Sequence, residues 1–137
     1  MKIIIQFLFV VAFSVCICSY GADQTAYSYK GFDTNEVLVI TGVLNLQINQ
    51  TNKVSGNWSF HTAGLRVSDK IRRTTGSGKL AGAINGKKIF LNLNPGWSDN
   101  NVTLNGDVTI TNISGTWGHY GYAGLMVGGK FEAMKKN

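Results

Sequence analysis

Aromatic residues beside glycines and amides are the side chains in this sequence best suited to contacting a ligand. Trp58 and Trp117 each lie two residues after a glycine, and Trp97 lies in a stretch rich in Asn, Pro and Gly. Indole and phenol rings stack on sugar rings and flat apolar ligands, while nearby amides and hydroxyls orient them. The alternative is that the two glycine-associated tryptophans fill the core. The predicted ligand-binding set is Trp58, Trp97, Trp117, His119, Tyr120 and Tyr122.

A second cluster is basic. Five cations fall within fourteen residues, namely Arg66, Lys70, Arg72, Arg73 and Lys79. Such a patch can bind anionic polysaccharide, lipid headgroups or the acidic rim of a protein, and added salt weakens that attraction. The stretch has no interleaved aromatics for base stacking, which argues against nucleic acid. A solvated loop is the alternative interpretation.

The residues that enzymes use are sparse, so the sequence predicts a protein without catalytic activity. His61 and His119 are the only histidines, and neither lies beside a pattern of metal ligands. The acidic residues fall mostly in turns or on polar faces, and no Gly-x-Ser-x-Gly elbow occurs. We expect no metal and no cofactor.

The N-terminus predicts export. Lys2 is followed by an apolar run from Ile3 to Ile17 and then by small residues. That length suits a signal peptide and is too short for a transmembrane helix. We expect cleavage after Gly21, which makes residues 1–21 the signal peptide and residues 22–137 one domain that is secreted or periplasmic. Val15 and Ile17 precede Cys16 and Cys18, which argues against a lipid anchor.

Cleavage would leave a cysteine-free, basic domain. Only Lys2 among the charged residues is lost, so the 13 basic residues become 12 against 7 acidic ones, a net charge of +5. Without a disulfide, the domain depends on apolar burial for its stability, and its length is sufficient for that. Charge of this size favours contact with anionic surfaces without identifying one.

Apolar and polar residues alternate with a period of two along most of the domain, which predicts antiparallel strands. About seven strands are clear, and residues 65–71 form a weaker candidate. The Asn85-Gly86 pair is typical of a tight hairpin turn. The expected fold is an all-β, up-and-down antiparallel barrel of about eight strands, with a β-sandwich as the alternative.

Glycines recur on the apolar faces of these strands and favour the barrel over the sandwich. A small closed barrel bends its strands sharply, and an inward glycine permits both the bend and a close approach of backbones. The inward glycines are Gly31, Gly42, Gly56, Gly82, Gly106, Gly115 and Gly129.

These features together predict a secreted binding protein with a small-molecule or glycan site at one barrel end. The architecture is analogous to that of avidin-like and lipocalin-like barrels, which hold small molecules at one end. The analogy is one of fold type and assigns no residues. The second hypothesis is a protein-binding, inhibitory or anionic-surface module that uses residues 66–79. Sequons for N-linked glycans occur at Asn49, Asn57, Asn101 and Asn112.

Overall fold

Eight strands and one short helix make up the computed structural model, which describes residues 23–137. The predicted signal peptide at residues 1–21, with Cys16 and Cys18, lies outside the described residues. The strands are β1 (Thr25–Phe32), β2 (Leu38–Ile48), β3 (Lys53–Thr62), β4 (Gly76–Asn85), β5 (Lys88–Asn92), β6 (Asn101–Val108), β7 (Asn112–Gly121) and β8 (Gly124–Lys135), and the helix is α1 (Asp69–Arg72).

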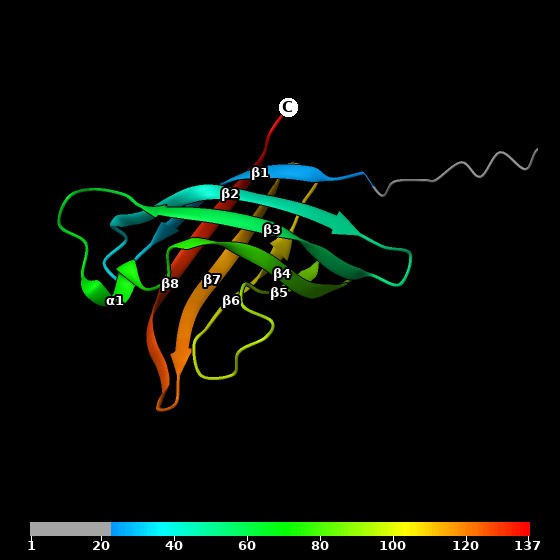
Figure 1. The fold of residues 1–137 in the computed structure, drawn as a ribbon. Helices are drawn as coiled ribbons and strands as arrows, with labels where there is room; N and C mark the ends of the chain where they lie inside the picture. Colours follow the sequence, from blue (N-terminus) through cyan, green and yellow to red (C-terminus); the bar gives the residue numbers. More distant parts are fainter. Residues whose placement is uncertain (1–22) are drawn as a thin grey trace, which may run out of the picture.

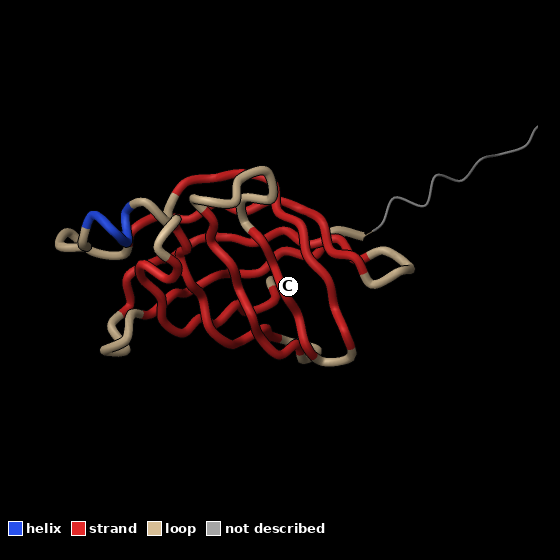
Figure 2. The backbone as a smooth tube through the Cα atoms, turned by 90° about the horizontal axis from the view of Figure 1, so that it is seen from below, coloured by secondary structure: helices blue, strands red, loops and turns tan. Residues whose placement is uncertain are grey.

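Every strand pairs antiparallel with its neighbour in sequence, and β8 returns to pair with β1. Tyr29 lies opposite Gly42 on one side and opposite Ala133 on the other. Figures 1 and 2 show that the strands form a single closed wall. The predicted up-and-down barrel is therefore confirmed, and the closure between β1 and β8 excludes the sandwich.

The meander order separates the loops into two sets. Residues 33–37, 63–75, 93–100 and 122–123 connect strands at one end, which we call the α1 end. The other three connections lie at the opposite end, where β1 begins and β8 finishes. The backbone N–H of Lys136 donates to the carbonyl of Ala26 at 2.8 Å, so the two ends of the described chain lie side by side.

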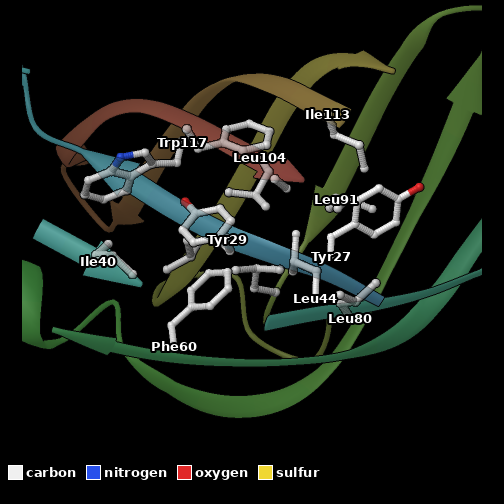
Figure 3. Close-up of a cluster of buried hydrophobic side chains, with 14 of the residues drawn as sticks. Tyr27, Tyr29, Ile40, Leu44, Phe60, Leu80, Leu91, Leu104, Ile113 and Trp117 are labelled. Atoms are coloured by element: carbon white, nitrogen blue, oxygen red, sulfur yellow. The ribbon is translucent and has the colours of Figure 1, made fainter. Parts of the chain in front are cut away.

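Side chains fill the interior, as expected for an eight-stranded barrel. The ring of Tyr29 stacks on Phe60 and on Phe131, with ring centroids 4.0 Å and 5.6 Å apart. Leu44, Leu91 and other aliphatic residues surround this stack, as Figure 3 shows. These buried residues occupy alternate positions along their strands, which confirms the predicted inward faces.

The inward glycines allow neighbouring strands to approach closely. A Cβ at Gly42 would lie 2.1 Å from the carbonyl oxygen of Ser59, and one at Gly115 would lie 2.0 Å from that of Asn105. No side chain fits at such distances without a shift of backbone. The interpretation of these glycines as points of close approach is consistent with this geometry.

One local prediction is wrong. Residues 65–71 form no strand; they run through an irregular segment into α1, where the Ser68 hydroxyl accepts a hydrogen bond from the Ile71 N–H. This cap and the buried side chain of Ile71 favour one helical turn over an extended strand. Of the aromatic residues near the end of β7, His119 and Tyr120 belong to that strand, and only Tyr122 and Ala123 form the turn before β8.

Candidate functional site

The barrel topology brings most of the predicted site residues to the α1 end. Trp97 lies on the β5–β6 connection and Tyr122 on the β7–β8 turn, while Arg66 and α1 lie on the β3–β4 connection. Each strand of a meander runs opposite to the one before it, so every second connection lies at the same end of the barrel. Residues separated by more than fifty positions in sequence therefore share one rim.

Trp58 and Trp117 lie inside the barrel. Trp117 is only 3% exposed, and its indole N–H donates to the carbonyl of Phe32 at 2.9 Å. The indole N–H of Trp58 donates to the carbonyl of Leu93 at 2.7 Å, and its ring contacts Phe60. Trp117 is thus bonded to the end of β1 and Trp58 to the start of the β5–β6 connection. These contacts agree with the alternative that both tryptophans fill the core.

Trp97 is 64% exposed on a braced loop. The Asn94 side chain donates to the carbonyl of Asn100 at 2.7 Å, which closes the base of the loop. The N–H of Trp97 donates to the carbonyl of Asn94 at 3.1 Å, which fixes the turn. The indole is therefore presented to solvent on a loop of defined conformation.

His119 supports this loop from inside the barrel. Its side chain is 3% exposed, and its Nε2 lies 2.7 Å from the Asn100 Oδ1. Because an amide oxygen only accepts, this contact places the proton on Nε2 and leaves Nδ1 as an acceptor. That Nδ1 is buried and has no hydrogen-bond partner within residues 23–137. Burial lowers the pKa of His119, and the positive charge of Arg73 lowers that pKa further.

Tyr120 and Tyr122 extend the aromatic rim along the β7–β8 hairpin, which projects at the bottom of Figure 1. Tyr122 is 94% exposed at the turn, whereas Tyr120 is 38% exposed and lies over Gly118. A Cβ at Gly121 would lie 3.6 Å from the carbonyl oxygen of Asp99. The hairpin and the Trp97 loop are therefore neighbours.

The basic residues divide into two groups. Arg66, Lys70, Arg72 and Arg73 are exposed on the β3–β4 connection, whereas Lys79 lies on the barrel wall opposite Asn57. The Arg72 Nε lies 3.9 Å from the Asp69 carboxylate, a loose and solvated pair. The four connection residues form the basic segment of the α1 end.

The sequence analysis missed a set of outward-facing residues on β6, β7 and β8. Asn105, Thr116 and Lys130 together line a groove on the outer wall that has a volume of about 460 Å³. The same groove also includes Tyr120 and Leu125, so it continues from the rim. The sequence contained no signal for Asn105, Thr116 and Lys130, because alternation marks polar residues only as solvent-facing.

The four sequons lie in different surroundings. Asn49 accepts hydrogen bonds from the N–H groups of Thr51 and Lys53, and Asn57 is exposed beside Asn45 on the wall. The Oδ1 of Asn101 is buried without a partner in the described part of the chain. The Oδ1 of Asn112 accepts from the Thr109 hydroxyl. Asn49 and Asn57 are thus the sequon positions most open to solvent.

Residues 23–137 contain no group of three or more His, Cys, Asp or Glu side chains that could hold a metal ion. No helix in this part of the chain is both long and apolar enough to cross a membrane.

Comparison of the sequence with protein-family models and with curated proteins finds no match. The functional argument therefore depends on the geometry of the α1 end and of the outer wall.

Proposed function

We propose that this chain is a secreted, non-enzymatic binding protein that holds a glycan at the aromatic rim of the α1 end. The observation that carries the proposal is the exposure of Trp97 on the β5–β6 connection and of Tyr120 and Tyr122 on the neighbouring β7–β8 hairpin. An exposed aromatic ring costs solvation energy unless a ligand covers it, and three together form a surface for stacking.

The packed interior supports a site at the rim. Tyr29, Phe60 and Phe131 stack across the barrel, and both inward tryptophans donate to backbone carbonyls. A ligand inside the barrel would have to displace these side chains, whereas a sugar ring can lie on Trp97 without such a change.

Polar groups beside Trp97 suit the hydroxyl groups of a sugar. Ser98, Asp99 and Asn100 follow it directly, and the side chain of Asn100 is held in place by His119. Hydrogen bonds from such fixed groups give orientation, while stacking gives affinity. The same elements suit a small planar ligand less well because the rim is open to solvent.

The first test is a glycan array followed by titration of the best ligand with the purified domain, residues 22–137. Trp97→Ala should weaken binding at least tenfold and should abolish the ligand-dependent change in tryptophan fluorescence, because Trp97 is the exposed indole. Ile110→Ala is the matched control, since Ile110 is 91% exposed at the opposite end. Equal binding by the two variants would refute a rim site.

A second function is favoured by the basic segment. Arg66, Lys70, Arg72 and Arg73 are all exposed on one connection that holds a single acidic residue, Asp69. An anionic polymer or an acidic protein would bind there through long-range attraction. The variant with all four cations changed to Gln should elute from a sulfated matrix at lower salt than wild type. Unchanged elution would remove this alternative, and the Trp97→Ala variant serves as its control.

A further inference from the structure

The strand register places five outward side chains in one row across the outer wall of the barrel. Phe90 lies opposite Asn105, Asn105 opposite Thr116, Thr116 opposite Lys130, and Lys130 opposite Phe32. The row crosses five strands, and at an interstrand spacing of about 4.8 Å it is roughly 19 Å long. An aromatic ring lies at each end, with an amide, a hydroxyl and an ammonium group between them.

The wall is hollowed along this row. Three grooves of about 460, 390 and 640 Å³ all include Thr116 in their linings, so they adjoin one another. On the side nearer the α1 end, Gly118 and Gly128 lie opposite each other and contribute no outward side chain. The adjoining grooves therefore form a trough that is continuous with the rim at Tyr120.

The charges that line the trough are largely paired with each other. The ammonium group of Lys130 lies 2.7 Å from the Glu36 carboxylate, and that of Lys88 lies 2.7 Å from the Asp107 carboxylate. The other acidic residues in the linings are Asp33 and Glu132. No unpaired cation lines the trough among the described residues, so an anionic chain finds no counter-charge there.

A closed barrel also disfavours an extended peptide as the occupant. Peptides that bind to sheets commonly add a strand to an exposed edge. Here β1 and β8 pair with each other, and every described strand has a partner on both sides. Contacts in the trough must therefore be made by side chains.

We propose that the trough binds an extended, neutral oligosaccharide that continues from the rim along the row from Phe32 to Phe90. This inference rests on the proposed glycan-binding function and extends it from one sugar ring to a chain. Sugar rings stack on the two phenylalanines, and sugar hydroxyls exchange hydrogen bonds with Asn105 and Thr116. A neutral chain is favoured over an anionic one because both lysines are already paired.

The test measures affinity against chain length, using neutral oligomers of glucose, mannose and N-acetylglucosamine with one to six units. Calorimetry should show an affinity that rises by at least about tenfold from the single sugar to the tetramer or longer oligomer of the preferred series. Thr116→Trp places a bulky side chain in all three grooves and should remove this gain while leaving the single-sugar affinity unchanged.

The matched control is Ser55→Trp, an exposed outward position on β3, which should keep the full gain with chain length. Circular dichroism checks that both variants retain the barrel. The milder Asn105→Ala should reduce the gain in part.

The other outcomes separate the two proposals. Binding that is sensitive to Trp97→Ala but independent of chain length, or unaffected by Thr116→Trp, overturns the trough and leaves the rim function intact. Absence of binding by every sugar and oligomer overturns both. Calorimetry with a peptide or an acidic oligosaccharide that shows tighter binding than the neutral oligomers identifies a different occupant and also overturns the proposal. A change of mass in light scattering on Thr116→Trp identifies a second copy and overturns it as well.

Discussion

His119 shows how one buried polar side chain can link the stability of the barrel to the geometry of its rim. The ring is enclosed between strands, donates from Nε2 to Asn100 and leaves Nδ1 without a partner in the described chain. A buried acceptor without a donor destabilises the fold by about 1 to 3 kcal/mol. The hydrogen bond from His119 at the same time fixes Asn100, which ends the loop that carries Trp97.

Acidification should destabilise the domain through His119. Its pKa is lowered in the folded state, so the unfolded chain binds a proton more readily than the folded chain does. The contribution of His119 to the free energy of unfolding is therefore complete above its ordinary pKa of 6.5 and is lost as the pH falls from there towards the folded-state pKa. Urea denaturation at several pH values measures this slope.

His119→Gln should flatten the slope because the titrating group is gone, and His61→Gln, at an exposed position, should retain it. An unchanged slope in His119→Gln would mean that another group controls the acid sensitivity.

Gly42 is a residue whose missing side chain is required by the fold. Gly42→Ala should lower the free energy of unfolding by about 2 to 3 kcal/mol, because the added Cβ would contact the Ser59 carbonyl and the Phe60 ring. Gly96→Ala is the control, since nothing lies within 4 Å of a Cβ at that loop position. Equal stability of the two variants in urea would contradict the close approach of β2 and β3.

At the scale of elements, α1 is a single turn attached to a long connection. Within residues 63–75, only Ile71 and Thr74 are buried. An element with so few buried side chains opens locally at lower free energy than the strands. Its position beside the rim places the basic residues on a segment that is less strongly held than the strands.

Ile71→Ala should speed amide hydrogen exchange in residues 69–75 by roughly thirty-fold, because the loss of this buried side chain lowers the local opening free energy by about 2 kcal/mol. Exchange in the core strands should change far less. Lys70→Ala, at an exposed position of the same turn, controls for helix propensity. An equal loss of protection in all strands would show that α1 belongs to the cooperative unit of the barrel.

At the scale of the whole molecule, closure joins the first and last strands. Tyr27 lies opposite Lys135, so both ends of the described chain are at the end away from the rim. All eight strands share one interior, and the interior stack draws on β1, β3 and β8. We therefore expect the domain to unfold in a single transition.

A circular permutant should keep both fold and binding. A short Gly/Ser linker from residue 137 to residue 23, with new ends between Gly86 and Lys87, leaves every connection of the α1 end intact. Its far-UV circular dichroism and its affinity for the array-selected glycan should match those of the linear domain. Loss of binding with retained structure would indicate that the opposite end takes part in the site.

Sequence alone was sufficient to predict the inward faces and to favour the barrel, whereas the pairing of β1 with β8 excluded the sandwich. Period-two alternation determines which side of a strand is buried, and recurrent inward glycines favour a tightly closed barrel over a sandwich. The sequence also predicted Trp97, Tyr120 and Tyr122 as ligand contacts, because aromatic residues near turns can be recognised without coordinates; the structure shows that all three are exposed. The helix at Asp69–Arg72 was missed because a single turn has no periodicity to detect, and its cap and one buried side chain are weak local signals.

Only the tertiary structure decided which of these residues share a surface. Trp58, Trp97 and Trp117 all lie near glycines in the sequence. Trp58 and Trp117 nevertheless face into the barrel and donate to backbone carbonyls, because their strand positions point inward. The row from Phe32 to Phe90 is invisible in the sequence because cross-strand register, which depends on the closure of all eight strands, places its members side by side. Alternation determines the face on which a residue lies, whereas closure and register determine its neighbours.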